Sequence, residues 1–127
     1  MFGFVKKNTG GFTIVELIIV VLIIGVIASL AIPFYFGYRK RAITVEAKTN
    51  LIALYKFEIN NFAEHDEFTS DLNALGFDPE SNKYYEYSVV TDGKSFTATA
   101  SGNIDNDLDQ DVWTINEKQA VVHAVED

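Results

Sequence analysis

The sequence contains no cysteine, so disulfide bonds cannot stabilise the fold and cysteine usage indicates no redox compartment. It has two histidines, His65 and His123, whereas a zinc site needs three or four ligands with suitable spacing. We therefore expect both to be surface histidines. The G-x-S-x-G, phosphate-loop and H-E-x-x-H motifs are also missing. We predict that the protein is not an enzyme and holds no cofactor, with calcium as the one ion left open.

Basic residues are scarce, because 10 Lys and Arg stand against 18 Asp and Glu, for a net charge of −8. If residues 1–11 are a leader that is cleaved off, Lys6 and Lys7 are lost with it and the net charge becomes −10. Such acidity argues against direct nucleic-acid binding, since phosphate neutralisation requires clustered Lys and Arg. It suits an exposed surface or a cation-binding one. The 127 residues allow one small globular domain and an anchor.

One long hydrophobic run is present, from Phe12 to Ile32, and Glu16 is the single charged residue among these 21. About 20 apolar residues in a helix match the roughly 30 Å hydrocarbon core of a bilayer. A carboxylate costs about 3 kcal/mol at the bilayer centre and less near its edge, so such an acid usually has a function. Glu16 either lies at the interface, snorkelling or protonated, or pairs with a buried positive charge.

The residues before this run are typical of a processing signal, because a short basic segment precedes the hydrophobic run. An ordinary secretory signal has its small-residue cleavage site after the run. Residues 6–16, KKNTGGFTIVE, resemble the class III signal sequence of type IV prepilins: a basic leader ending in Gly, then Phe, then Glu four residues later. Pro33 also falls where this family places a proline. From Val45 onward the chain resembles, more loosely, the short cysteine-free pilins of deltaproteobacterial type.

This resemblance implies a pilus subunit that is cleaved after Gly11 and N-methylated at Phe12 by a prepilin peptidase. It implies a cytoplasmic leader and a periplasmic head, first in the inner membrane among lipids and then, through the pilus assembly machinery, in an extracellular filament for motility or adhesion. Its main partner is then another copy of the chain. In this family Glu16 of one subunit is thought to pair with the amine of Phe12 on its neighbour. An α-amino group has a pKa of about 7.7–8.0 and is mostly protonated at neutral pH, so a buried carboxylate would gain a partner.

Two small interruptions lie inside the predicted membrane helix. Pro33 lacks an N–H and its ring crowds the carbonyl of Ser29, so we expect a kink or a local opening there. Gly25 and Ser29 form a small-xxx-small pair that lets another helix approach closely. The resemblance suggests that the segment from Gly25 to Pro33 loosens in the filament.

The predicted helix continues to about Ala63 and becomes amphipathic. Apolar residues recur on one face at helical spacing: Ile43, Ala47, Leu51, Leu54, Tyr55, Ile59 and Phe62. Glu58 breaks this face, so it must lie at the rim or find a partner. We divide the chain into a leader (1–11), a membrane and polymerisation helix (12–63) and a globular head (64–127).

The head reads as two β-hairpins after a short helix. Ser70 is expected to cap a helix at 71–75 that Gly76 stops, followed by a loop at 78–82. Turn signals at 92–93 and 116–119 separate the predicted strands 84–91, 96–100, 112–115 and 120–125. The predicted fold class is α+β, a long N-terminal helix packed on a small antiparallel sheet of about four strands.

Four acids alternate in the loop before the third strand: Asp105, Asp107, Asp109 and Asp111. A calcium ion favours several oxygen ligands, and alternating aspartates can wrap one. The EF-hand pattern fails, because Gln110 replaces the turn glycine and Asn116 replaces the bidentate glutamate. A solvated acidic loop is the alternative.

Three other functions share parts of this pattern. A minor pilin or a type II secretion pseudopilin carries the same N-terminus, and the acidic loop is similar to that of calcium-binding major pseudopilins. The proline- and tryptophan-rich stretch usual in those proteins is missing between Asn61 and Tyr84. A signal-anchored periplasmic ligand-binding module would be neither cleaved nor polymerised, and it would leave Glu16 without a partner.

Overall fold

The computed structural model describes residues 3, 10–78, 84–105 and 107–126. Most of the predicted leader and of the loop 78–82 lies outside these ranges. The chain divides into two units, Met1–Tyr38 and Arg39–Asp127, and one helix, α1 (Ile14–His65), contributes to both. The second half of α1 is part of the globular unit because its buried face completes the core of that unit.

In the first unit, α1 is an apolar helix without a core of its own. Every side chain from Ile14 to Tyr38 is exposed. The helix is long and apolar enough to cross a membrane by length and composition, a test that a signal sequence also passes. It is helical through Gly25 and Pro33 without interruption, so the local opening predicted at Pro33 is absent from the secondary structure. Loosening of this segment in a filament stays a prediction.

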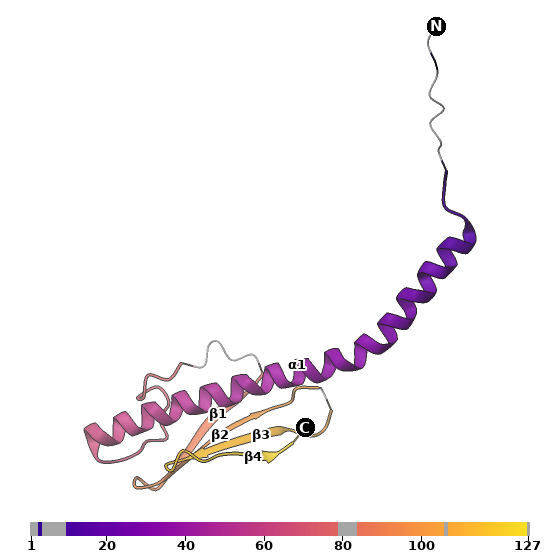
Figure 1. Ribbon diagram of the computed structural model, residues 1–127. Coiled ribbons are helices and arrows are strands. Elements are labelled where there is room, and N and C mark those ends of the chain that lie inside the picture. Colours follow the sequence, from indigo (N-terminus) through magenta and orange to yellow (C-terminus); the bar gives the residue numbers. More distant parts are fainter. Residues whose placement is uncertain (1–2, 4–9, 79–83, 106, 127) are drawn as a thin grey trace. The chain divides into compact units, whose positions relative to one another are not determined.

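In the second unit, four strands form an antiparallel sheet in the order β1-β2-β3-β4. Their bounds are β1 (Glu86–Thr91), β2 (Phe96–Gly102), β3 (Asp111–Asn116) and β4 (Val121–Val125). The second half of α1 lies along this sheet (Figure 1). The predicted α+β fold is therefore confirmed, with strand ends that differ from the expected ones by one or two residues.

The two predicted hairpin turns form for local reasons. In the first, Asp92 accepts hydrogen bonds from the backbone of Lys94 and Ser95, at 2.9 and 2.7 Å, and Gly93 adopts a positive φ of 88° that suits glycine. In the second, the side chain of Asn116 accepts from the backbone N–H of Lys118 and Ala120. Asx chemistry thus sets both turns.

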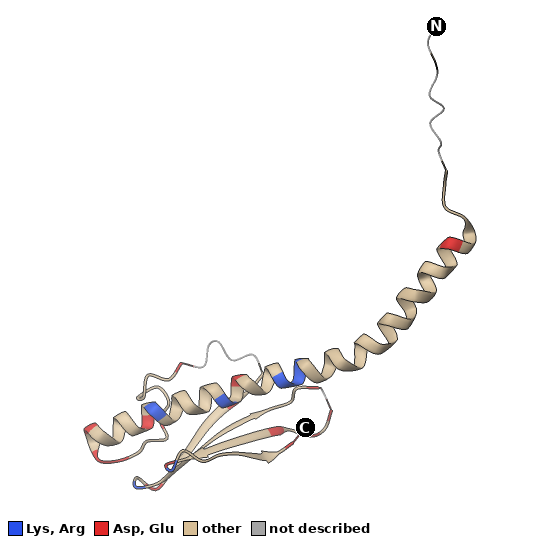
Figure 2. Cartoon of the chain, viewed as in Figure 1, with Lys and Arg blue, Asp and Glu red and all other residues tan. Residues whose placement is uncertain are grey.

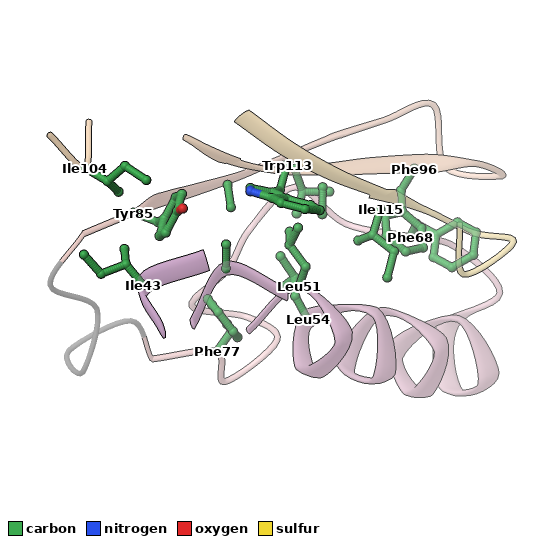
Figure 3. Packing of buried hydrophobic residues seen from close by; sticks show 14 residues of the cluster. Ile43, Leu51, Leu54, Phe68, Phe77, Tyr85, Phe96, Ile104, Trp113 and Ile115 are labelled. Carbon is green, nitrogen blue, oxygen red and sulfur yellow. The ribbon is translucent and has the colours of Figure 1, made fainter. Parts of the chain in front are cut away.

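The core lies between α1 and one face of the sheet (Figure 3). Leu51 and Leu54 are fully buried on α1 and face a cluster that includes Phe96 and Ile115. Burial of such a side chain contributes about 1.5–3 kcal/mol. The predicted apolar face is correct at most positions but wrong at Ile59, which is 37% exposed. Glu58 occupies the core position instead.

The segment after α1 differs from the predicted short helix. Residues 72–76 form turns, and Asp71 rather than Ser70 caps them, since its Oδ1 accepts from the N–H groups of Asn73 and Ala74. Gly76 ends the turn with a φ of 71°, and the N–H of Phe77 donates to the carbonyl of Leu72 at 3.0 Å. One turn is too short to count as a helix, although the predicted stop at Gly76 is correct.

Candidate functional site

Glu16, near the N-terminal end of α1, is the single charged residue between Phe12 and Tyr38. Figure 2 shows the apolar half of α1 with an acidic residue near its start. Thr13 directly precedes the helix and donates to Glu16 Oε2 from its backbone N–H at 2.8 Å and from its hydroxyl at 3.1 Å. The N–H of Glu16 in turn donates to the hydroxyl oxygen of Thr13 at 3.2 Å. This reciprocal pair is a capping box, in which the carboxylate satisfies orphan donors at the helix start. Glu16 therefore has a partner within its own chain.

Sequence reasoning missed this role of Glu16, although its signal was present. A threonine followed three residues later by glutamate, just before an apolar run, is the pattern of a capping box. A negative charge at this point also interacts favourably with the helix dipole. An amine from another molecule that binds the Glu16 carboxylate would add to the hydrogen bonds that Thr13 donates to it, or would replace them.

The predicted processing site lies directly before this cap. Gly11 and Phe12 are both exposed and precede the first helical residue, and the Phe12 side chain is 93% exposed. A Cβ placed on Gly11 would meet no atom within 4 Å. No described part of this chain covers either residue.

The predicted small-residue pair also lies on an open helix surface. A Cβ at Gly25 would meet no atom within 4 Å. The hydroxyl of Ser29 donates to the carbonyl of Val26 at 2.7 Å, so this polar group is satisfied within its own helix. Both positions can face an apolar neighbour without leaving a polar group unpaired.

The structure does not bring the four predicted calcium ligands together. Asp105, Asp107 and Asp109 lie in an exposed loop, where backbone N–H groups donate to the side chains of Asp105 and Asp107, at 3.3 and 2.8 Å. Asp111 is instead fully buried at the start of β3. Within residues 10–78, 84–105 and 107–126, no three His, Asp or Glu side chains are grouped so that they could hold a metal ion. Calcium binding in this loop stays a prediction, without Asp111 among the expected ligands.

Asp111 is instead the centre of a buried polar cluster. Its carboxylate accepts hydrogen bonds from the hydroxyl of Tyr85, from Trp113 Nε1 at 2.7 Å and from His123 Nε2. Burial alone would raise the pKa of Asp111, but the hydrogen bonds from Tyr85, His123 and Trp113 outweigh it and hold the pKa below the ordinary value. Burial, reinforced by the neighbouring carboxylate, raises the pKa of the Tyr85 hydroxyl well above its usual range. Asp111 is thus ionised and Tyr85 neutral at ordinary pH.

The expectation for the two histidines is half correct. His65 is exposed at the end of α1. His123 is partly buried, and its ring stacks on Trp113 with centroids 4.0 Å apart and planes 6° apart. No sequence signal links His123 to Asp111, because a bulge in the β3–β4 pairing sets which residues lie opposite each other.

Glu58 is the other fully buried acid of the globular unit, with an exposed fraction of 0%. Its Oε2 accepts the backbone N–H of Thr69 at 3.1 Å, whereas its Oε1 has no hydrogen-bond partner among the described residues. Burial raises the pKa of Glu58, and the bond from Thr69 offsets only part of that rise. Glu58 has found a partner as expected, but in the core and not at the rim.

Comparison with known proteins finds a matching N-terminal motif and several similar proteins. The chain matches the family described as prokaryotic N-terminal methylation motif over residues 6–32. It is 46% identical over 79 residues to the type IV major pilin protein PilA of Myxococcus xanthus, covering 62% of this chain and 36% of that protein. It is 31% identical over 91 residues to the type II secretion system core protein G of Vibrio cholerae, covering 67% of this chain and 62% of that protein. A solved type IV pilin structure from Shewanella oneidensis is similar at a TM-score of 0.48 and 16% identity, covering 69% of this chain and 93% of that one.

The chain therefore spans about a third of the length of PilA and less than two thirds of protein G. The methylation motif, the exposed apolar helix and the sheet-bearing head together define the class of pilin-like subunits. Within this class, the methylation motif and the similarity to PilA support a type IV pilin.

Proposed function

We propose that the chain is the structural subunit of a type IV pilus, cleaved after Gly11, N-methylated at Phe12 and polymerised through α1. The observation that carries this proposal is a helix from Ile14 to Tyr38 with every side chain exposed, in a chain whose second unit has a core of its own. In a monomer such a helix needs lipid around it. In a filament, the same surface packs against other copies, where close packing between helices supplies the stabilisation.

Glu16 sets the axial register of an incoming subunit. Cleavage after Gly11 turns the N–H of Phe12 into a protonated amine, one residue before the capping threonine. The hydrogen bonds from Thr13 leave the Glu16 carboxylate without a counter-charge, which is costly in a low-dielectric bundle. A cationic partner removes most of that cost without adding much net stability. The pair thus selects one alignment of neighbouring helices, and apolar packing holds it.

The proposal of a pilus subunit also specifies the partners and the location of the chain. A prepilin peptidase removes the leader on the cytoplasmic side. Before assembly, the chain is anchored in the inner membrane with its head in the periplasm. The pilus assembly machinery then transfers it into an extracellular filament, which serves motility or adhesion. The acidic head forms the outer surface of the filament, and we expect no direct binding of nucleic acid by it.

A type II secretion pseudopilin is the second candidate, supported by the 31% identity to a core protein G. Both candidates require the same helix and the same processing, so they differ in where the polymer is found. Gel electrophoresis of material sheared from the cell surface distinguishes them. A major pilin forms the dominant band of that material, whereas a pseudopilin or a minor pilin does not.

Intact-mass analysis of the sheared surface material tests the main proposal. We expect a species that begins at Phe12 and carries one added methyl group. A species that retains Met1 and stays in the membrane fraction would contradict cleavage and polymerisation alike, and would favour a signal-anchored binding module.

A further inference from the structure

Three consecutive basic residues on α1, Arg39, Lys40 and Arg41, begin the second unit, and we call them the basic collar. Arg39 and Arg41 are exposed, and Lys40 is half-buried. None of the three takes part in an ion pair among the described residues. The collar is therefore a group of cations that has no acidic partner in the part of the chain that the structure describes.

The lack of a partner is notable because acids are abundant in the rest of the second unit. Residues 42–127 hold 17 Asp and Glu but 5 Lys and Arg. A single exposed cation without a partner is ordinary, since a surface ion pair contributes little. No other stretch of the sequence, however, holds three adjacent cations. Such a local density of charge attracts an anionic partner over roughly 8 Å at physiological salt.

The position of the collar along α1 matches the edge of a bilayer. Residues 17–38 carry no charge, so Glu16 and Arg39 bound a helical span of 22 residues. At 1.5 Å per residue this span is about 33 Å long, against roughly 30 Å for the hydrocarbon core of a bilayer. Tyr35 and Tyr38, just before the collar, are 65% and 67% exposed, as expected of aromatic residues at headgroup level. Figure 2 shows basic residues grouped on α1 where its apolar half ends.

The arrangement of the collar around the helix suits a surrounding layer of anions. Consecutive residues of an α-helix project about 100° apart, so residues 39–41 point across more than half of the circumference. Lipid headgroups surround a membrane helix on all sides, whereas the acids of a second copy would approach it from one side. Arg and Lys side chains also reach phosphate oxygens while their aliphatic stems cover apolar surface. The phosphate groups of lipids therefore fit the collar better than an acidic patch of protein.

We propose that Arg39, Lys40 and Arg41 bind the phosphate groups of anionic phospholipids and hold the chain at a defined depth in the membrane before assembly. This inference rests on the membrane-anchored stage of the proposed function. Attraction between the collar and the headgroups offsets the repulsion between an anionic membrane surface and the acidic residues 42–127. Transfer into a filament breaks these contacts, so the collar adds to the work of extracting the subunit from the membrane.

NMR spectroscopy of the full chain in micelles of a neutral detergent tests the collar. Added phosphatidylglycerol should shift the backbone amide signals of residues 39–41 and saturate, whereas phosphatidylcholine, which has no net charge, should not. Arg39→Gln combined with Arg41→Gln should raise the lipid fraction at half-saturation roughly twentyfold, since each cation near an anionic surface contributes a factor of about five. Lys56→Gln combined with Lys118→Gln removes two other exposed charges and should leave this midpoint unchanged.

Four results would overturn the proposal. An unchanged midpoint in the double arginine variant would show that these side chains do not bind the lipid. Equal shifts with phosphatidylcholine would mean apolar insertion alone, and equal shifts with inorganic phosphate would mean binding of any free anion. Shifts that grow with protein concentration in the absence of anionic lipid would assign the collar to the acids of a second copy. None of these results bears on cleavage after Gly11, and an uncleaved species in the intact-mass analysis would overturn the pilus subunit but not the collar.

Discussion

Two fully buried acids of the globular unit Arg39–Asp127, Glu58 and Asp111, have opposite electrostatic environments. Asp111 receives three side-chain donors, and its pKa is lowered in spite of burial. Glu58 receives one backbone donor, and burial raises its pKa. The two side chains are equally buried, yet their pKa values shift in opposite directions. The number of hydrogen-bond donors decides whether the charged form of each acid is favoured.

The raised pKa of Glu58 predicts a cost of ionisation in the folded head. A raised pKa in an acid gives stability that is present below the ordinary value of 4.5 and is lost as the pH rises through the folded value. We expect Glu58→Gln to stabilise the head by about 1 kcal/mol at neutral pH and to give no gain near pH 4. Thermal unfolding of the full chain in micelles at both pH values measures this. The exposed Glu64→Gln on the same helix is the control, and equal effects of the two variants would refute the account.

At the scale of elements, α1 is one helix that serves two environments. Its first half exposes apolar side chains all round, and its second half buries one face against the sheet. The helix begins with a capping box, although the apolar run itself begins two residues earlier. The start of the helix is thus set by polar chemistry and not by hydrophobicity.

Removal of the cap should fray the first turn of α1. Thr13→Val keeps the shape of the side chain but deletes its hydroxyl, which bonds the side chain and the N–H of Glu16. Loss of an N-cap costs about 1 kcal/mol, so amide exchange at residues 14–17 should rise several-fold. Thr44→Val is the matched control, because the hydroxyl of Thr44 bonds to the Arg41 carbonyl within the helix. Equal exchange in both variants would show that the capping box does not set the helix start.

At the scale of the whole molecule, the structure assigns head stability to the second half of α1, and the proposed function assigns assembly to the first half. The core of the globular unit buries Leu51 and Leu54, whereas every side chain from Ile14 to Tyr38 is exposed. Mutations in the two halves should therefore have separable effects on folding and on polymerisation.

Two leucines on α1 test this separation for folding. Leu54→Ala leaves a cavity in the core and should destabilise the head by about 2–5 kcal/mol. Leu22→Ala removes the same atoms from an exposed position in the first unit and should leave the melting temperature of the head unchanged. Circular dichroism melts in micelles compare the two, and a similar loss from Leu22→Ala would contradict the division.

Glu16 tests the separation for assembly. Glu16→Ala should leave head stability and leader removal intact while the yield of surface filaments falls strongly, because the partner for the Phe12 amine is gone. Electron microscopy counts the filaments, and immunoblots follow processing. Thr13→Val, which removes capping but keeps the carboxylate, separates loss of pairing from loss of helix order. Normal filament number and length in Glu16→Ala would reject the electrostatic docking account.

Much of this architecture is local and could be predicted from the sequence alone. The apolar run, the Asp92–Gly93 turn, the Asn116 turn and the stop at Gly76 each depend on neighbouring residues, so periodicity and turn chemistry predict them. The match of residues 6–32 to the methylation motif is local in the same sense. The helix, the hairpins and the resemblance to type IV pilins could therefore be predicted from the sequence.

Only the tertiary structure determines which hydrogen-bond partners the buried polar residues have. Asp111 bonds to Tyr85 across 26 residues and to His123 across 12, and Glu58 bonds to Thr69 across 11. Such pairs depend on sheet register, on a bulge and on the path of the loop after α1, none of which leaves a periodic signal in the sequence. The sequence predicts one calcium loop from Asp105 to Asp111, but the structure buries Asp111 and leaves the other three aspartates exposed. A charge can be buried only where the fold supplies hydrogen-bond donors to it.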